Sequence, residues 1–489
     1  MMRQQQWLAT THRKSGTSLV VGGVLGAVLL IGGLSVYSYA QRDIPERHAD
    51  VIEHFKYGSI GSESRAGIPY WIWLVLPRVF PQYLPDRPGD GYARMGFVYE
   101  TPGAARPIGT SYRERPIGLV GLNCATCHVG TVKDSPQGPA RIVLGMPAHQ
   151  FDIEAYFWFL FACGRDPRFN ADTLLPAIKA ANPQFSWFDE QFYRFVVIPQ
   201  ARDGIVKQAD ALGFTYQRPP FGPGRVDTFN PYKQRFGIDM QADNTVGTAD
   251  FPPLFNQRMR EHMWLHWDGN NNFVQERNKS AAIGAGANPD SLDLDSLQRV
   301  SDWIMDLPPP AIPKERIDTT RVARGAEIYQ AQCAECHALT GAKVGHVTPI
   351  GEIGTDPERL NSFTPDLVNH MLTIGTGYSW KFSHFRKTDG YANMPLDGIW
   401  LRAPYLHNGS VPTLRDLLKP PSERPKVFYR GYDVYDYTNV GFVSGGQAAE
   451  QTAFRYDTRV RGNGNGGHSY GATLNPTEID DLIEYLKTI

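Results

Sequence analysis

The spacing of apolar residues along the chain predicts helices over 151–161, 185–211 and 320–332. In each segment apolar residues recur at intervals of three and four, which is the pattern of a helix that buries one face. The clearest helix lies at the C-terminal end. Asn475 suits its N-cap, Pro476 suits the first helical position, and Glu478 can complete a capping box. Its buried stripe consists of Ile479, Leu482, Ile483 and Leu486.

Between these segments the pattern breaks into loops. Residues 43–147 are irregular, with many turn-forming residues around short apolar pieces. Four prolines within 306–313 would stop a preceding helix and stiffen the connection. We therefore expect a domain boundary near residue 312.

The first forty residues differ in kind. Residues 15–40 carry no charge, are rich in Val, Leu and Gly, and are long enough to cross a bilayer. Basic residues precede them, which favours an N-inside orientation. The small residues at 38–40 also suit a signal cleavage site, but the apolar run is longer than a usual signal core, which favours a retained anchor. We expect the rest of the chain on the periplasmic side of the inner membrane, or secreted if cleavage follows Ala40.

Composition narrows the function classes. A hydrophobic content of 42% is that of a globular protein, and 489 residues suggest two or three domains. A net charge of −1, with no dense basic run beyond the N-terminus, gives no case for a nucleic-acid partner.

Two short sequence motifs, called the haem words below, indicate which cofactor the chain binds. Residues 124–128 and 333–337 each read C-x-x-C-H, the pattern in which two thiols attach a c-type haem and the histidine binds its iron. Four of the chain's five cysteines fall in these words. A zinc site would not require the adjoining histidine. The attachment residues are Cys124, Cys127 and His128 for one haem c, and Cys333, Cys336 and His337 for a second.

These observations predict a mainly α fold. It has two cytochrome c-like haem domains with long loops and little β-structure, preceded by one N-terminal transmembrane or signal helix. The predicted divisions are an anchor or signal segment at 1–40, a first haem domain at 41–312 and a second at 313–489. The helix at 320–332 runs into the second haem word, whereas the first word lacks so clear an entering helix. Cys163, among aromatic residues, is expected to be an unreactive buried thiol.

The second ligand of each iron decides the function, because an iron with two strong protein ligands passes electrons and one with an open position can bind dioxygen or peroxide. For the second haem the candidates are Met394 and His468, the latter in a glycine-rich stretch that allows close approach. Both candidates stay open on these grounds.

Residues 402–414 and the Trp-Asp-Gly at 267–269 resemble the di-haem cytochrome c peroxidase superfamily. The match is closer to its rubber oxygenase branch, enzymes that cleave the double bonds of polyisoprene with dioxygen. Residues 54–73, the first haem word, 276–278 and 467–468 also look like that branch. The resemblance covers nearly everything after the first forty residues.

The resemblance implies three roles. Trp267 would lie between the haems and relay electrons. His468 would be the second axial ligand of the C-terminal haem. The haem held by His128 would then be the open one that takes dioxygen.

Two differences from the peroxidases also favour a dioxygenase. Leu406 stands where those enzymes often have a methionine ligand, and residues 280–284 supply no acid where peroxidases place a glutamate. An apolar pocket containing some of Ala281, Ala282 and Ile283 suits an oily substrate. Glu276 lies nearby in sequence, so a peroxidase remains an alternative.

We therefore expect a dioxygenase that cleaves C=C bonds of an isoprenoid or aryl-alkene, as a small molecule or a polymer. The alternatives are a peroxidase that reduces hydrogen peroxide and a membrane-bound electron-transfer cytochrome c. Expected partners are dioxygen, a periplasmic electron donor, and the membrane through the N-terminal helix. The resemblance also leaves open a calcium ion between the domains.

Overall fold

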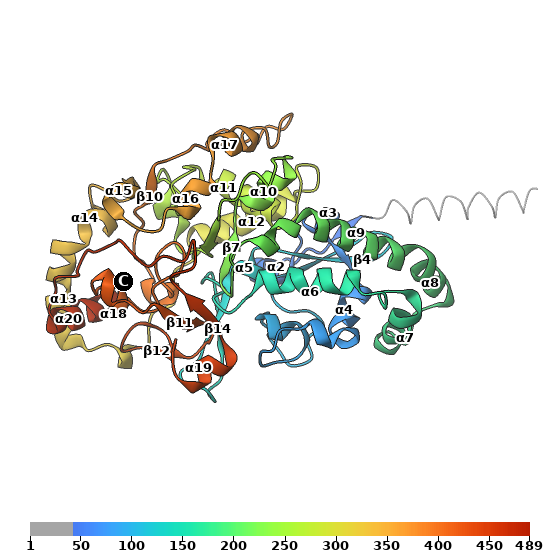
Figure 1. The fold of residues 1–489 in the computed structure, drawn as a ribbon, viewed down its shortest axis with the longest axis horizontal. Helices are drawn as coiled ribbons and strands as arrows, with labels where there is room; N and C mark the ends of the chain where they lie inside the picture. Colours follow the sequence, from blue (N-terminus) through green and yellow to red (C-terminus); the bar gives the residue numbers. More distant parts are fainter. Residues whose placement is uncertain (1–42) are drawn as a thin grey trace, which may run out of the picture.

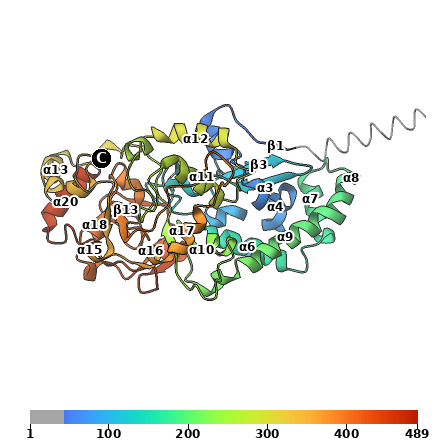
Figure 2. The same cartoon turned by 90° about the horizontal axis from the view of Figure 1, so that it is seen from above.

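The computed structural model describes residues 43–489, so the expected anchor at 15–40 lies outside it. The described chain is elongated, with α4 (Tyr70–Val79) and α7 (Ala171–Ala181) toward one end and the C-terminal helices at the other (Figures 1 and 2). It is largely helical with limited strands, as the sequence predicts. None of the described helices is both long and apolar enough to cross a membrane.

A four-stranded antiparallel sheet leads into the first haem word. Its strands, in spatial order, are β1 (Ile44–Pro45), β3 (Thr110–Glu114), β4 (Gly118–Leu122) and β2 (Ile68–Pro69). Only β3 and β4 are neighbours in sequence. The sequence pattern did not predict this sheet, and a strand, β4, rather than a helix precedes Cys124.

The helical predictions in the N-terminal part hold with one change. The predicted helix at 151–161 is α6 (Ile153–Arg165), capped by Asp152. The predicted helix at 185–211 consists of α8 (Trp187–Phe192), a π-helical turn (Tyr193–Val197) and α9 (Ile198–Ala211). Pro199 has no N–H to continue the regular hydrogen bonding, and such a gap favours a local π turn.

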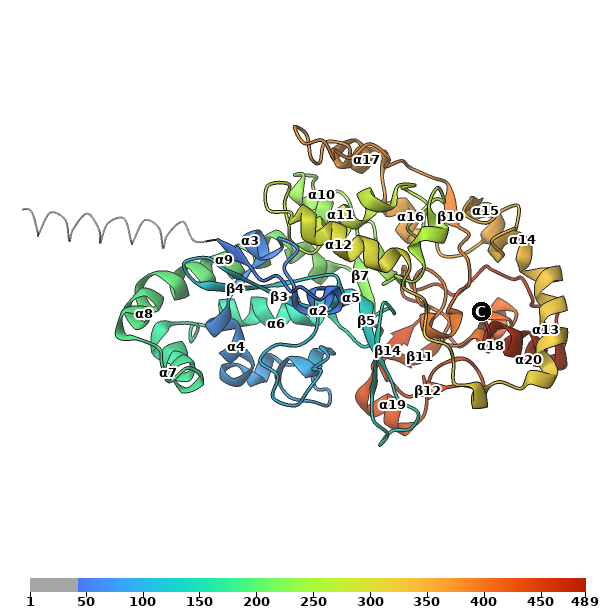
Figure 3. The same ribbon diagram turned by 180° about the vertical axis from the view of Figure 1, so that it is seen from behind.

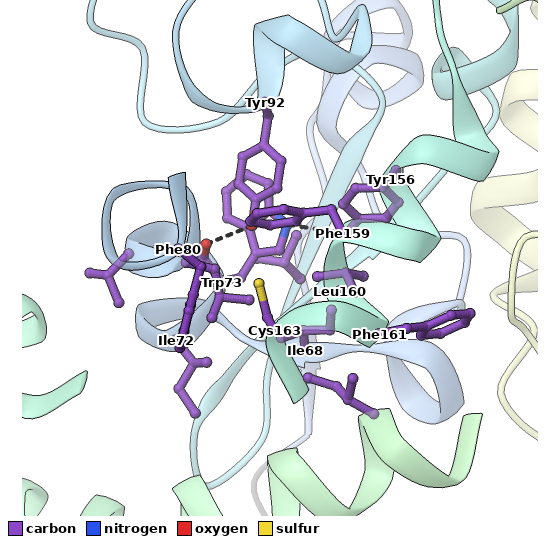
Figure 4. Packing of buried hydrophobic residues seen from close by; sticks show 14 of the residues in the cluster. Ile68, Ile72, Trp73, Phe80, Tyr92, Tyr156, Phe159, Leu160, Phe161 and Cys163 are labelled. Carbon is purple, nitrogen blue, oxygen red and sulfur yellow. Dashed lines mark hydrogen bonds between the residues drawn. The ribbon is translucent and has the colours of Figure 1, made fainter. Parts of the chain in front are cut away.

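Aromatic side chains of α4 and α6 form the core of this part (Figure 4). Trp73 stacks on Tyr92 with 4.3 Å between ring centres and donates its indole N–H to the Tyr156 hydroxyl at 3.2 Å. Cys163 is fully buried among these rings, and burial raises the pKa of its thiol. The fifth cysteine is therefore a packing residue, as expected.

The predicted linker is packed rather than free. Helix α12 (Leu294–Met305) ends just before residues 306–313. Within them the Pro310 carbonyl accepts a hydrogen bond from Trp400 Nε1 at 3.0 Å, and Ile312 is buried. The helix stop is confirmed, while the domain boundary near 312 stays a prediction.

Two predicted helices frame the second haem word. Helix α13 (Thr319–Gln332) runs into it, and α20 (Pro476–Leu486) packs against α13 (Figure 3). Asn475 and Glu478 form the expected capping box. A helix entering the haem word and a closing helix packed on it is the layout expected of a cytochrome c domain.

The other elements are short. The paired strands are β5 (Val129–Val132) with β6 (Arg141–Leu144), β7 (Arg225–Asp227) with β8 (Thr248–Asp250), β9 (Val347–Pro349) with β10 (Gly390–Ala392), β11 (Val427–Arg430) with β14 (Phe454–Asp457), and β12 (Tyr435–Asp436) with β13 (Gly441–Phe442). The α-helices are α2 (Val51–Tyr57), α3 (Glu63–Ala66), α5 (Ala125–His128), α10 (Asn230–Arg235), α11 (Val274–Gly284), α14 (Ala334–His337), α15 (Ile350–Ile353), α16 (Glu358–Ser362), α17 (Pro365–Met371), α18 (Leu414–Leu417) and α19 (Gln447–Thr452).

Candidate functional site

The first haem word is held in place by loop backbone. Asn123 accepts a hydrogen bond from Ala125 N–H at 3.0 Å, and Thr126 Oγ1 donates to the Gly109 carbonyl at 2.5 Å. Gly109 has φ +93°, and a Cβ there would lie 2.5 Å from Thr126 Cα, so the close approach requires glycine. The single turn α5 therefore presents Cys124, Cys127 and His128 from a fixed position.

The ring of His128 is in the form that binds metal. Burial and, after it, Arg277 lower its pKa to about 3, against an opposing effect of the Pro252 carbonyl. Its Nδ1 is buried and makes no hydrogen bond of ordinary geometry. A neutral imidazole is the form that ligates iron.

The second haem word follows α13 directly. The Cys333 N–H donates to the Tyr329 carbonyl at 2.9 Å, and α14 then carries the ring of His337 inward. His337 Nδ1 donates to the Met394 carbonyl at 2.7 Å. Since a carbonyl only accepts, Nδ1 carries the proton and Nε2 keeps its lone pair for a metal.

The ring of His468 faces that of His337. Their centres are 6.2 Å apart, with 40° between the planes. Two metal–imidazole bonds of about 2.0 Å, with about 1.1 Å from each nitrogen to its ring centre, give roughly the same separation. Burial, and then His337, lower the pKa of His468 to about 4, so both rings are neutral near pH 7. This spacing fits one iron between two histidines.

The structure separates the two candidates for that second ligand. Met394 contacts His337 Nδ1 through its backbone carbonyl at 2.7 Å, whereas the ring of His468 lies at the separation that fits a shared iron. The geometry therefore favours His468, whose role as a ligand stays a prediction.

The approach of His468 depends on Gly467. Gly467 has φ +68°, and a Cβ there would lie 2.2 Å from the Gly354 carbonyl carbon. We expect Gly467→Ala to cost about 1–2 kcal/mol from the left-handed conformation alone and to displace the His468 ring. Low-spin haem absorbance and thermal unfolding check this, with Gly445→Ala, where a Cβ meets open space, as the control. An unchanged low-spin fraction in the Gly467 variant would contradict the expectation.

The four cysteines of the two words suit covalent attachment. All four are half-buried and none forms a disulfide in the described part of the chain. Cys124 packs against a cluster of apolar side chains that includes Phe229, Ala282 and Ile283. Cys127 and Cys333 also pack against apolar clusters, whereas Cys336 lies near charged side chains. Half-buried thiols beside a neutral histidine suit covalently held haem c.

Trp267 lies between the segments that hold the two proximal histidines. Its indole N–H donates to the Asp250 carbonyl at 2.9 Å, two residues before Pro252, whose carbonyl acts on His128. Its own carbonyl accepts a hydrogen bond from Ala392 N–H at 2.8 Å, two residues before Met394. The chain thus ties this tryptophan to both sites.

Buried polar contacts fix the turn around Trp267. Asp268 and Arg359 form a buried ion pair at 3.2 Å, and Asn270 Nδ2 donates to Asp268 at 3.0 Å. His407, from the Pro-Tyr-x-His stretch, is buried against Tyr391 and shares a 3.0 Å hydrogen bond with its hydroxyl. These contacts hold the loop rigidly, and removing one member of the buried pair would leave an uncompensated charge.

The predicted pocket residues on α11 separate into two groups. Ala282 and Ile283 are buried in the same apolar cluster as Cys124. Ala281 is exposed, so of the three only Ala282 and Ile283 could line the predicted pocket. Consecutive helical residues point about 100° apart, so the three cannot all face one side.

Glu276 is occupied by structural contacts. One oxygen accepts from Asn271 Nδ2 at 2.9 Å and from His384 N–H at 3.0 Å, and the other accepts from Ser383 N–H and from His384 Nδ1, both at 2.9 Å. Its carboxylate therefore anchors the loop at 383–384 to α11. This arrangement leaves no lone pair directed at a substrate proton.

We expect Glu276→Gln to lower the free energy of unfolding by about 1–3 kcal/mol, because an amide cannot accept all four hydrogen bonds. The rate of peroxide turnover per folded molecule should stay close to that of the original chain. Denaturant unfolding and pH-dependent peroxide turnover check this together. A loss of about 10²–10⁴ in peroxide turnover would instead identify Glu276 as a general acid.

Sequence reasoning missed Arg277 and two backbone groups. Arg277 acts electrostatically on His128, Cys124 and His266, and burial lowers its own pKa to about 10. The carbonyls of Pro252 and Met394 contact the proximal histidines, and no side-chain pattern could have indicated them. Arg277 stands in the Glu-Arg-Asn stretch that the resemblance singled out, which was the available signal.

The described residues give no support to the predicted calcium ion. In residues 43–489 no three His, Cys, Asp or Glu side chains gather as ligands for a bare metal ion.

Comparison with known proteins supports the haem assignment. Residues 390–429 match a family described as RoxA-like, cytochrome c-like, and residues 320–379 match one described as cytochrome C oxidase, cbb3-type, subunit III. Both matches lie in the C-terminal part. They support a cytochrome c family and covalently bound haem c.

Two proteins of Sinorhizobium fredii (strain NBRC 101917 / NGR234) are similar to this chain. The uncharacterized protein y4iM is 32% identical over 285 residues, which cover 49% of this chain and 64% of that protein, under two thirds of its length. The uncharacterized protein y4iJ is 25% identical over 501 aligned residues, which cover 82% of this chain and 81% of that protein. Neither name states an activity.

Proposed function

We propose that this chain is a di-haem c-type dioxygenase that cleaves carbon–carbon double bonds of an apolar substrate at the His128 site. The observation that carries the proposal is the unequal surroundings of the two proximal histidines. His337 has the ring of His468 facing it at 6.2 Å. In the described part of the chain no ring faces that of His128 at a comparable distance.

Each group of residues has a part in this reaction. A c-type haem with one protein ligand supplies an iron position open to dioxygen, and one with two ligands supplies electrons. His128 would hold the first and His337 with His468 the second. Ala282 and Ile283 keep water from the first site and suit an apolar substrate. Trp267 would pass electrons, since it is hydrogen-bonded to segments from both sites.

Two alternatives make different demands on the same residues. Reduction of hydrogen peroxide needs a proton donor near the His128 site, and Glu276 is held by four hydrogen bonds. A simple electron carrier needs a second ligand for the first iron. We also propose a periplasmic location and a periplasmic electron donor, both of which rest on the sequence of residues 1–40.

Labelled dioxygen tests the proposed reaction. The purified chain is incubated with a polyisoprenoid or an aryl-alkene under ¹⁸O₂, and carbonyl products are examined by mass spectrometry. We expect label in the carbonyls, and the same yield from His370→Ala, which removes a half-buried histidine on α17. Absence of labelled carbonyls, together with fast turnover of peroxide and a reduced donor, would contradict dioxygenase activity.

A further inference from the structure

Four large aromatic side chains are exposed on one helical arm. Trp187, Phe188, Phe192 and Phe195, from α8 and the π turn that follows, are 65%, 78%, 41% and 71% exposed. We call these four residues the aromatic tip. Soluble proteins rarely expose several large apolar side chains together, and such patches mark sites of interaction.

The arm that carries the aromatic tip is well ordered by its own contacts. Ser186 and Asp189 form a capping box at the start of α8. Lys179 pairs with Glu190 at 2.9 Å, and Arg194 pairs with Asp172 at 2.6 Å, which fixes the arm to α7. The rings are therefore held outward by a folded element, and the charges beside them are paired.

The arm lies at the end of the molecule where the described chain begins. β1 starts at Ile44, and Figure 2 shows it in the half of the molecule that carries α8. Asp43, just before it, pairs with Arg113 of β3 at 2.5 Å. The chain therefore enters the fold on the side that carries the aromatic tip.

The sequence before Asp43 indicates what covers this end. Residues 15–40 are uncharged and long enough to span a bilayer. Only three residue steps join Ala40 to Asp43, so at most about 10 Å separates them. If residues 15–40 span a bilayer, Asp43 lies next to its surface, and so does this end of the molecule.

We propose that the aromatic tip inserts into the headgroup region of the bilayer that residues 15–40 span. Tryptophan and phenylalanine on an amphipathic surface bind at this boundary, where an apolar face is partly buried. Because neighbouring charges are paired, the contact depends on apolar burial and needs no anionic lipid. The proposal rests on the membrane expectation for residues 15–40 and is independent of the reaction at the haems.

Hydrogen exchange on the full chain tests the contact. The protein is compared in detergent-free phosphatidylcholine nanodiscs and in short-chain detergent, and amide exchange is followed for peptides covering 187–197. Brominated phosphatidylcholine adds a second readout, because Trp187→Phe should remove part of the tryptophan quenching. We expect slower exchange and measurable Trp187 quenching in nanodiscs. Equal exchange and no Trp187-dependent quenching would overturn the proposal.

A matched pair of variants separates the tip from the anchor. Phe188→Ser with Phe195→Ser should fold normally, because both side chains are largely exposed. The double variant should lose the nanodisc protection at 187–197 while still remaining with the lipid. Leu294→Ser, at an exposed apolar residue on α12, should keep the protection. Protection that appears without lipid and grows with protein concentration would instead show contact between copies of the chain, and would overturn the proposal.

Discussion

Replacing His468 with alanine is expected to double the number of carbon monoxide molecules that the reduced chain binds, from one to two. In the present structure the ring of His468 lies 6.2 Å from that of His337, the separation that suits one iron between them. Removing it leaves that iron with one protein ligand and an open position. Carbon monoxide and cyanide titrations followed by absorbance measure the change.

Two controls make this result specific. His370→Ala removes a half-buried histidine on α17 and should leave one binding iron. Added imidazole should restore the low-spin spectrum of the His468 variant by occupying the position that the side chain left. If His468→Ala leaves both the spectrum and the ligand stoichiometry unchanged, the assignment of His468 is wrong.

Replacing Cys124 and Cys127 with alanine is expected to leave one covalently bound haem per chain and to abolish label transfer from dioxygen. These two thiols belong to the first attachment motif only. The second motif, at 333–337, lies far from it in sequence and keeps both of its thiols. Mass spectrometry of the denatured chain counts the attached haems. This readout does not depend on whether the variant folds fully.

The reciprocal variant is the control for the cysteine pair. Alanine at Cys333 and Cys336 should also leave one haem, but it should remove the low-spin signal and keep an iron that binds carbon monoxide. Cys163→Ala should keep both haems, because that thiol is buried in the aromatic core. Two haems on the Cys124 and Cys127 variant would contradict the attachment site.

Local sequence signals predicted the C-terminal part well. Helix α20 is determined by residues close together in the sequence, namely the capping residues Asn475 and Glu478 and its apolar stripe. Such a helix can therefore be recognised from the sequence alone. The same holds for α13, which runs into a haem word whose spacing is itself a local signal. Helices and haem-attachment motifs can be predicted without knowing which distant residues contact them.

Features that depend on distant contacts could not be predicted. Strands β1 and β2 join the sheet through partners far along the chain, and their two-residue lengths carry no periodic pattern. The Met394 carbonyl that orients His337 is a backbone group and has no signature in the sequence. The hydrogen bonds that the loop at 383–384 donates to Glu276 join residues more than 100 positions apart, so no local pattern could indicate them.

The predicted pocket residues also show that the sequence does not reveal how a helix is oriented in the fold. Sequence reasoning expected some of Ala281, Ala282 and Ile283 to line the pocket, because they occupy the stretch where peroxidases place a glutamate. The helix α11 turns Ala281 to the surface and the other two toward Cys124. The resemblance pointed to this helix, and the orientation of the helix decides which of its residues could line the predicted pocket.

The central claim is that one iron centre carries histidines on both faces while the other keeps a position free. Titration of the dithionite-reduced native chain with carbon monoxide, against haem content measured on the same sample, tests this directly. The account predicts one carbon monoxide for every two haems. A stoichiometry of zero, as for an electron carrier, or of two would contradict it.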